Sequence, residues 1–346
     1  MPPVNQETRR VAVIGVGRMG RHHARVMSRE EGVEFLGVLD ADAERAADVV
    51  ETHGGRTFDS LEGLLAAGPD AVVVATPTIT HPELVIGLLE RGIACLVEKP
   101  LAADAAESHR IADAAAASGA VLQVGHVVRF DPLMRAIRSI DGLEPRFIQM
   151  ERISPMTFRS VDVGVVLDMM IHDLDLLLML VGSEPEEIHA NAVSVLGEAE
   201  DVCNARLVFP PGTDGVRCVA NVTASRLAMK TERRLRIIGP EHYVSADFAT
   251  RSGTVVTKTA NQSQLDEVRR RLKGGEDLSD LDYLELVKVD RIEVADGDPL
   301  TLQAREFLEA VREGRSPEVD AKTGLAAVRT AERIVETARA AGSRMV

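Results

Sequence analysis

The stretch VAVIGVGRMG, residues 11–20, decides the fold. A short apolar run of β-branched residues ends in a GxGxxG pattern, and a helix-forming stretch from residue 18 to about residue 30 follows it. In this pattern Gly15 permits a tight turn, Gly17 lets the backbone approach a pyrophosphate, and Gly20 allows the helix to pack closely on the strand. The start of the helix offers free N–H groups and a partial positive charge to phosphates. The stretch therefore predicts a strand, a turn and a helix that bind a dinucleotide.

Residue 40 is the next informative position outward from this turn. Residues 33–39 form the second predicted strand, and Asp40 ends it. An acidic side chain there accepts hydrogen bonds from the hydroxyls of the adenine ribose, and its charge repels the additional phosphate of NADP. Asp40 therefore favours NAD as the cofactor. Arg45 is close in sequence and could weaken this preference, but it is interpreted as a solvated helix residue.

Strand and helix patterns alternate through the first third of the chain. In the segment DAVVVA at 70–75, every residue after Asp70 is apolar, as expected for a parallel strand that is covered on both faces. The alternation predicts an α/β Rossmann domain with a doubly wound parallel sheet over residues 1–125. The predicted strands are 11–15, 33–39, a short piece near 57, 70–75, 93–97 and 121–124, and the predicted helices are 18–30, 41–53, 60–67, 82–91 and 103–118.

The pattern changes after residue 125. Runs of strands without crossover helices predict a large open, mostly antiparallel sheet in an α+β domain over residues 126–346. The charged segment 265–282 is predicted to be a surface excursion, and the two closing helices can pack back on the first domain. The predicted elements are a helix at 131–140, a strand at 146–153, an apolar helix at 163–181, strands at 188–195, 203–209, 216–225, 233–238 and 242–247, and helices at 300–312 and 324–341.

Composition excludes several classes of partner. The formal net charge is −14 and the chain has no Trp, so it repels a phosphate backbone and offers few aromatic platforms for bases. Cys95, Cys203 and Cys218 show no metal-ligand spacing, which favours buried thiols in a reducing cytoplasm. The first ten residues lack an apolar leader, and charges interrupt the apolar run 163–181. We therefore expect a cytoplasmic protein that binds neither nucleic acid nor membrane.

Two polar motifs follow predicted strands of the first domain. Thr76, Pro77 and Thr78 follow the strand at 70–75, and the motif EKP at 98–100 follows the strand at 93–97. The carboxyl ends of parallel strands line the ligand crevice of an open α/β sheet. We therefore expect the threonines to lie at the nicotinamide end of the cofactor and Lys99 to meet a ligand. His81 has two interpretations, a cofactor contact or an ordinary residue at a helix start.

The apolar helix at 163–181 carries an unexpected polar group. Asp168 and His172 are four residues apart, so they share one helix face, and Asp175 follows on the next turn. A buried carboxylate is costly unless it is paired or functional, and an Asp beside a His orients the ring and tunes its pKa. The pair is therefore a candidate acid–base site, and the alternative is a structural polar cluster. Asp173 points away from this face, and no third ligand with metal-like spacing is present, so we predict no metal site.

The order of these motifs resembles the Gfo/Idh/MocA family, which is named after glucose–fructose oxidoreductase and inositol dehydrogenase. The resemblance rests on GRMG at 17–20, TP at 76–77, EKP at 98–100 and DMMIHDLD at 168–175, and it extends to residues 299–307. It implies that Lys99, Asp168 and His172 are catalytic and that Pro100 follows a cis peptide bond. Arg129 and Phe130 resemble an RF pair at the junction between the family's domains. The residues expected to bind the cofactor are Gly15, Gly17, Arg18, Met19, Gly20, Asp40, Thr76, Pro77, His81, Glu98 and Lys99.

The resemblance also implies a reaction, the NAD-dependent oxidation of a secondary alcohol of a sugar. His172 would take the hydroxyl proton as hydride leaves, and Lys99 would stabilise the developing alkoxide; which of the two is the formal base stays open. The expected substrate residues are Lys99, Arg152, Arg159, Asp168 and His172.

Arg152 and Arg159 lie in the segment 151–163 that leads to these residues, and they indicate an anionic substrate group. Their alternative is solvation, or pairing with Glu151 and Asp162.

Residues 165–173 resemble family members that oxidise the 3-hydroxyl of UDP-N-acetylglucosamine-type sugars. The alternatives are a free polyol such as inositol as substrate, a glycoside hydrolase that uses NAD transiently, and a non-catalytic NAD-binding sensor. A large sheet with one uncovered face would expose apolar surface, so a homodimer or homotetramer is expected.

Overall fold

The computed structural model describes residues 8–157, 163–279 and 281–343. The chain forms two compact units, each built from three segments. Unit 1 contains residues up to 131 together with 166–178 and 297–336, and unit 2 contains 132–165, 179–296 and the residues from 337 onward.

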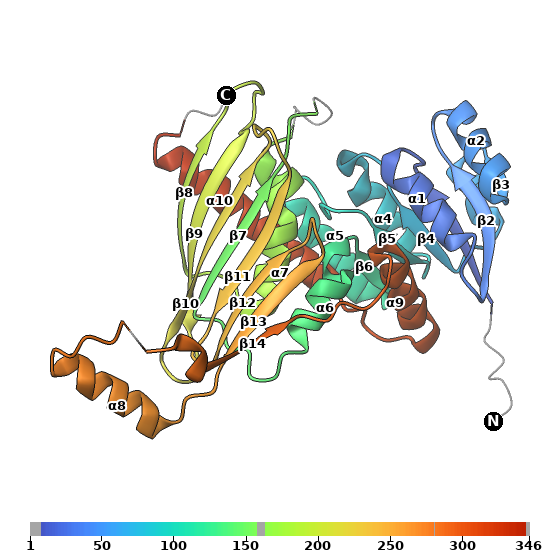
Figure 1. The fold of residues 1–346 in the computed structure, drawn as a ribbon. Helices are drawn as coiled ribbons and strands as arrows, with labels where there is room; N and C mark the ends of the chain where they lie inside the picture. The colour runs from blue at the N-terminus through green and yellow to red at the C-terminus, as the bar shows by residue number, and fades with distance from the viewer. Residues whose placement is uncertain (1–7, 158–162, 280, 344–346) are drawn as a thin grey trace, which may run out of the picture. The chain divides into compact units, whose positions relative to one another are not determined.

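The sheet of unit 1 has six parallel strands in the order β3-β2-β1-β4-β5-β6 (Figure 1). Strand order reverses between β1 and β4, and an open α/β sheet binds its ligands beyond the carboxyl ends of the strands at such a point. The predicted doubly wound parallel sheet is thereby confirmed. The strands are β1 (Arg9–Ile14), β2 (Val33–Leu39), β3 (Arg56–Phe58), β4 (Ala71–Val74), β5 (Ala94–Val97) and β6 (Leu122–Val124).

Helices cover both faces of this sheet. In β1, Val11 and Val13 belong to one buried cluster, whereas Ala12 and Ile14 belong to another. Successive side chains of a strand point to opposite faces, so the two clusters are the two faces of the sheet. The first cluster includes residues of α1 (Arg18–Met27), α2 (Ala43–His53) and α9 (Pro299–Glu313). The second includes residues of α3 (Leu61–Ala66), α4 (His81–Leu89), α5 (Ala105–Ser118) and α10 (Ala321–Ala340).

Side-chain caps set the starts of three of these helices. Asp42, Ser60 and Asp104 accept hydrogen bonds from backbone N–H groups in the first turns of α2, α3 and α5. Such caps satisfy N–H groups that have no partner within the helix, and each contributes about 1 kcal/mol. Each cap fixes the residue at which a loop ends and a helix begins. The loops that lead from the strands into these helices therefore have defined ends.

Unit 2 contains an eight-stranded sheet in the order β14-β13-β12-β11-β7-β10-β9-β8. All neighbours are antiparallel except β7 and β10, which are parallel, so the predicted mostly antiparallel sheet is confirmed. The predicted helix at 131–140 is the shorter α6 (Pro132–Arg138). The strands are β7 (Phe147–Ile153), β8 (Glu187–Val193), β9 (Val202–Pro211), β10 (Arg217–Ser225), β11 (Glu232–Ile238), β12 (His242–Asp247), β13 (Ser252–Lys258) and β14 (Val287–Arg291).

Three elements of unit 2 differ from the prediction. Strands β13 and β14 extend the sheet, and the predicted surface excursion contains helix α8 (Gln262–Lys273). Helix α8 has no buried residue, and Asn261 caps it through a reciprocal pair of hydrogen bonds with Gln264. The prediction missed this helix because its charged residues resemble a solvated loop when no apolar face is required.

One face of this sheet is buried and the other is half exposed. In β7, Ile148 and Met150 are buried, whereas Phe147 and Gln149 point to the opposite face. The strand registers align Phe147 with apolar neighbours from β9 to β14 in one continuous row. This apolar row consists of Val208, Val219, Phe147, Ile238, Tyr243, Val256 and Val289.

The predicted helix at 163–181 is divided. Val166–Met170 forms a π-helical turn, and α7 (Ile171–Val181) continues it as a regular helix. The N–H of Val165, just before this turn, donates to the carbonyl of Glu200 at 2.9 Å. Single π-helical turns occur frequently at functional sites. None of the helices that the structure describes is both long and apolar enough to span a membrane.

Candidate active site

The glycine turn after β1 has room for a ligand at one position only. A Cβ atom on Gly15 would lie 2.7 Å from the carbonyl oxygen of Ala75, and one on Gly20 would lie 1.8 Å from the carbonyl oxygen of Gly15. Gly15 also has φ +82°, a conformation that favours glycine. A Cβ on Gly17 would meet no atom within 4 Å. Gly15 and Gly20 are therefore needed to build the turn, and Gly17 leaves open space beside the start of α1.

The N-terminus of α1 is suited to phosphate. Gly17 precedes the helix and provides no side-chain cap for its first N–H groups. Uncapped N–H groups and the helix dipole attract an anion. Arg18 is exposed at the first position, and Met19 packs partly against the core of unit 1. The turn thus fits a pyrophosphate, with Arg18 available beside it.

Asp40 is engaged with the same turn. Its carboxylate accepts hydrogen bonds from the N–H of Val16 at 2.6 Å and from the N–H of Asp42 at 2.9 Å. Arg45 lies in α2, as predicted, and its side chain is 42% exposed, but it is also paired. Its guanidinium pairs with Asp42 at 2.9 Å and with Asp40 at 3.4 Å, because Asp42 caps α2 one turn before it. A cation therefore lies beside the carboxylate that would bind the ribose.

The loop after β4 is tied to the loop after β5 by His81. One ring nitrogen of His81 lies 3.2 Å from the carbonyl oxygens of Pro100 and Leu101, and the other lies 3.1 Å from that of Thr76. The ring is buried, and burial lowers the pKa of His81 despite these hydrogen bonds. His81 thus contacts backbone rather than open space. Thr76 is half buried and Pro77 is exposed in the same loop, and the hydroxyls of Thr76 and Thr80 lie 2.7 Å apart.

The EKP motif follows β5 and contacts helix α1, which follows the glycine turn. The peptide bond between Lys99 and Pro100 is cis, as the family resemblance implies. Glu98 is buried, and its carboxylate lies 2.7 Å from Nε2 of His23 on α1. Burial raises the pKa of Glu98, but the hydrogen bond and charge of His23 outweigh it, so the pKa lies below its usual value. The carboxylate therefore holds the backbone of Lys99 against α1.

Lys99 meets Asp168 within unit 1. The Nζ of Lys99 donates to the carbonyl oxygen of Asp168 at 2.6 Å and pairs with its carboxylate at 3.2 Å. The Lys99 side chain is mostly buried, with 17% exposed, and that of Asp168 is 38% exposed. His172 is half buried in the first turn of α7, four residues after Asp168. Lys99 and Asp168 are 69 residues apart in the sequence, and the fold brings the ammonium of one into contact with the carboxylate of the other. The imidazole of His172 lies on the same helical segment as Asp168.

Two parts of this surrounding were not predicted from the sequence. Arg129, interpreted as a junction residue, forms a buried ion pair with Asp175 on α7. His126 directly follows β6 and is 1% exposed. Neither of its ring nitrogens has a hydrogen-bond partner among the described residues, and burial lowers its pKa. The carboxyl-end rule that identified Thr76 and Lys99 also applies to β6 and could have singled out His126.

The two predicted substrate arginines differ in position. Arg152 lies in β7 on the buried face of the unit 2 sheet and is only 8% exposed, so it is not a solvated loop residue. The alternation of side chains along the strand explains this, because Arg152 shares a face with Ile148 and Met150. Arg159 lies outside the described residues.

A nicotinamide dinucleotide fits the donor set of unit 1. The open space at Gly17, the uncapped N-terminus of α1 and the carboxylate of Asp40 match a pyrophosphate and a ribose. Over residues 8–157, 163–279 and 281–343, no group of three or more His, Cys, Asp or Glu side chains could hold a metal ion. Cys95, Cys203 and Cys218 are all buried free thiols, and burial raises the pKa of Cys203 to about 12 and that of Cys218 to about 11.

Family models match both parts of the chain. A model described as an oxidoreductase family with an NAD-binding Rossmann fold matches residues 9–126. The model of the GFO/IDH/MocA C-terminal domain matches residues 146–245.

Individual relatives agree with these models. The chain is 38% identical to the UDP-N-acetylglucosamine 3-dehydrogenase of Acidithiobacillus ferrooxidans over 69% of this chain and 74% of that protein. It is 29% identical to an inositol 2-dehydrogenase of Rhizobium meliloti over 69% of this chain and 76% of that protein. The solved structure of the Acidithiobacillus enzyme superposes with a TM-score of 0.85 over 97% of this chain and 99% of that one, at 31% identity. A levoglucosan dehydrogenase bound to NADH and levoglucosan shares the fold, with a TM-score of 0.80 at 18% identity.

Proposed function

Because the chain belongs to the Gfo/Idh/MocA family of oxidoreductases, we propose that it oxidises the 3-hydroxyl of a UDP-N-acetylhexosamine with NAD. The observation that carries the proposed chemistry is the contact of Lys99 with Asp168, with His172 on the same helical segment. The observation that favours the nucleotide sugar is the 38% identity to a UDP-N-acetylglucosamine 3-dehydrogenase.

In this proposal unit 1 binds the cofactor. Gly17 and the start of α1 hold the pyrophosphate, with Arg18 beside it. The carboxylate of Asp40 accepts hydrogen bonds from the ribose hydroxyls. The carboxylate of Asp40 disfavours the additional phosphate of NADP, so we propose NAD as the preferred cofactor. Arg45, which pairs with Asp40, weakens this preference because it supplies a positive charge at the same place. Thr76 and Pro77 border the nicotinamide end, and His81 and Glu98 support that end through the loops they fix.

The cofactor, when bound, accepts a hydride from the carbinol carbon of the sugar. The hydroxyl proton must leave the same carbinol, and His172 is the proposed acceptor of that proton. The Nζ of Lys99 donates a hydrogen bond to the oxygen and stabilises its developing negative charge. Asp168 holds the Lys99 ammonium at 3.2 Å and so orients it toward the substrate. The sugar alcohol becomes a ketone and the proton stays on His172. NADH carries the two electrons of the transferred hydride.

A diphosphate on the substrate requires a positive partner. We propose Arg159 for this role, because it lies in the segment that leads to the catalytic helix. Arg152, which is buried in β7, stays a proposed substrate residue beside it. Replacing Arg159 with Ala should therefore abolish binding of a UDP-sugar while leaving binding of NADH unchanged.

We also propose that the chain forms a homodimer or homotetramer through the open face of the unit 2 sheet. The apolar row that includes Phe147, Ile238 and Tyr243 would otherwise remain in contact with water. Three buried free thiols favour a reducing cytoplasm as the place where the protein works.

The test is a screen that follows NADH formation with UDP-N-acetylglucosamine, UDP-N-acetylgalactosamine, myo-inositol and free monosaccharides, each with NAD and with NADP. NADH formed with a UDP-sugar supports the proposal. The second candidate, an inositol dehydrogenase, is favoured by the 29% identity to such an enzyme, and turnover of inositol alone would establish it instead. Release of free sugar from a glycoside without net NADH would identify a hydrolase. NADH binding without turnover of any sugar would identify a sensor.

Melting temperatures provide a second readout for the UDP-sugar. In the presence of NADH, a UDP-sugar should raise the melting temperature of the parent protein but not that of Arg159→Ala. Equal stabilisation of both proteins would remove Arg159 from the site and leave the proposed reaction untouched.

A further inference from the structure

Arg129 and Asp175 form a two-point ion pair in the interior of unit 1. Nε of Arg129 lies 2.7 Å from one carboxylate oxygen of Asp175, and Nη2 lies 2.8 Å from the other. Arg129 is 6% exposed and Asp175 is 1% exposed. Two parallel hydrogen bonds between planar groups fix both distance and orientation, which a single contact or an apolar contact does not.

The pair attaches the proposed catalytic helix to the end of β6. Arg129 lies in the short helix η2 (Val127–Phe130) that follows β6, and Asp175 lies in α7, three residues after His172. Residues three apart in an α-helix lie on neighbouring positions of one face. The ion pair therefore holds α7 on the face that carries His172, about one turn away.

Helix α7 needs such an anchor at its start. It begins after the π-helical turn that carries Asp168, and His172 itself is only half buried. Ile171, buried next to His172, packs in an apolar cluster of unit 1. Apolar packing of this kind tolerates small rotations and shifts, whereas a two-point ion pair is directional.

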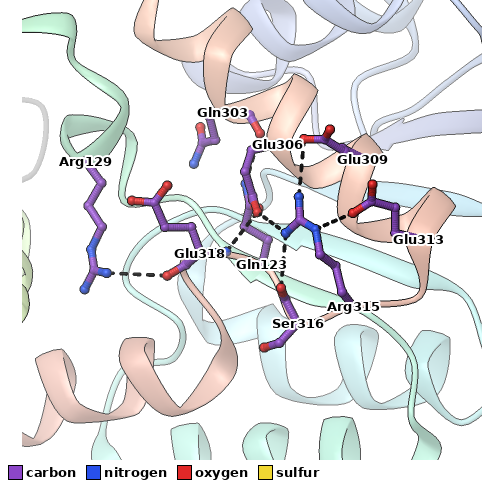
Figure 2. Close-up of polar contacts among 9 residues, drawn as sticks. All are labelled: Gln123, Arg129, Gln303, Glu306, Glu309, Glu313, Arg315, Ser316 and Glu318. Carbon is purple, nitrogen blue, oxygen red and sulfur yellow. Dashed lines mark hydrogen bonds and ion pairs between the residues drawn. The ribbon is translucent and has the colours of Figure 1, made fainter. Parts of the chain in front are cut away.

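A second layer of polar contacts holds Arg129 from behind. Nη1 of Arg129 donates to the carbonyl oxygen of Glu318 at 3.4 Å, and the N–H of Glu318 donates to Oε1 of Glu306 on α9 at 3.0 Å (Figure 2). Arg315 donates to the same Oε1 at 2.8 Å. Figure 2 shows Arg315 at the centre of three carboxylates of α9, and it also pairs with Glu309 and Glu313. The loop between α9 and α10 is therefore fixed where it meets Arg129.

We propose that Arg129 and Asp175 are a positioning pair, which sets the rotation and height of α7 so that His172 and Asp168 face the substrate. This inference rests on the proposed dehydrogenase function. Both residues are buried, and in this proposal both act through the helix. A buried ion pair is costly to desolvate, and apolar residues of similar volume often stabilise a protein as well or better. The selective value of this pair is therefore orientation rather than stability.

Replacing both residues of the pair with apolar residues separates orientation from stability. The double variant Arg129→Met/Asp175→Leu keeps the volume and burial of the pair but removes its directionality. It should melt at or above the parental temperature. Its kcat should fall about 10²-fold, the loss that a displacement of about 1 Å at a reacting group can cause, with KM for the sugar and the dissociation constant of NADH unchanged.

Conservative variants supply the comparison. Arg129→Lys keeps the charge but cannot make two parallel bonds, so it should lower kcat to a similar degree and not rescue it. Arg146→Lys is the matched control, because Arg146 pairs with Asp214 and Glu144 in unit 2. It should keep the parental kcat. A double variant with both parental stability and parental kcat would show that the pair does not position the helix.

A measurement without substrate separates this inference from the proposed reaction. The imidazole signal of His172, assigned in NMR spectra by its loss in His172→Gln, should shift in the double variant and in Arg129→Lys but not in Arg146→Lys. If the parent oxidises no sugar but this signal moves, the positioning pair stands and the proposed function fails. If the signal and kcat both stay parental in the double variant, the positioning inference fails and the proposed function stands.

Discussion

His172 is the side chain whose removal tests the proposed chemistry most directly. It is half buried in the first turn of α7, close in sequence to Asp168, which contacts Lys99. His172→Ala should lower kcat by about 10²–10⁴-fold, because a positioned general base contributes roughly that factor. Binding of NADH, followed by the quenching or enhancement of its fluorescence, should stay parental, since His172 lies outside the glycine turn. An unchanged kcat would remove His172 from the mechanism.

For single residues, the sequence indicated which residue types follow the strands, but it did not indicate which side chains form ion pairs with them. The cluster of Lys99, Asp168 and His172 could be proposed because each is a costly residue in an apolar surrounding. The partner of Asp175 could not be identified, because Arg129 is 46 residues away and no local spacing relates the two. Asp40 and Arg45 are close in sequence, and their pairing was still missed, because the cap on α2 decides where Arg45 points.

The glycine turn, taken as an element, makes two different predictions for two of its glycines. Gly20→Ala should prevent the turn from closing and lower the melting temperature even without cofactor, because its Cβ would lie 1.8 Å from the carbonyl oxygen of Gly15. Gly17→Ala should melt like the parent, since its Cβ meets nothing within 4 Å, but should bind NADH more weakly. Calorimetry and NADH titration of both variants check this. Weaker NADH binding without loss of stability in Gly20→Ala would contradict the assignment.

The turn between β8 and β9 gives a prediction about acid stability. The buried carboxylate of Asp201 accepts hydrogen bonds from the N–H groups of Val195 and Leu196, each at 2.7 Å, and from Nε of Arg226 at 2.7 Å. Burial alone would raise the pKa of Asp201, but these hydrogen bonds outweigh it and lower the pKa to about 2. Because the pKa is lower in the folded state than in the unfolded chain, the ionised carboxylate stabilises the fold above about pH 4, and this stability is lost as the pH falls toward 2.

The expected size of this effect is about 2 kcal/mol, from the difference between the two pKa values. Asp201→Asn should therefore lower the free energy of unfolding in urea at neutral pH and flatten its dependence on pH between about 4 and 2. Asp48→Asn, a change at an exposed aspartate of α2, is the control and should leave the curve parental. A parental curve for Asp201→Asn would show that the turn does not depend on this charge.

Elements were predicted well where periodicity and burial coincide. The strands of unit 1 could be predicted because they are short apolar runs, and both faces of the sheet are covered. β13 and β14 were missed because neither carries a clear apolar face, and their residues are mostly half buried or exposed. The π-helical turn at Val166–Met170 was not predicted, because apolar periodicity does not distinguish its backbone hydrogen-bond pattern from that of a regular helix.

At the scale of the whole molecule, the open face of the unit 2 sheet predicts self-association. Phe147→Asp places a charge in the middle of the apolar row and should convert the oligomer to monomer, because an unpaired charge is costly to bury in an interface. Val195→Asp, the same type of change at an exposed apolar residue outside the row, should keep the parental mass. Light scattering after size exclusion measures both. A parental mass for Phe147→Asp would direct the search for the interface elsewhere.

The division of unit 1 into three segments has a consequence for how the protein is made. The core of the parallel sheet includes Phe307 from α9 and Ile171 from α7, so it lacks parts until residue 336 has been synthesised. At a ribosomal rate of about 5–20 residues per second, the nascent dinucleotide fold waits roughly 10 to 40 seconds after residue 131 for its remaining core. Until then the apolar face meant for α9 is exposed on the emerging chain. Shielding of that face during translation is therefore a requirement separate from the final stability of the protein.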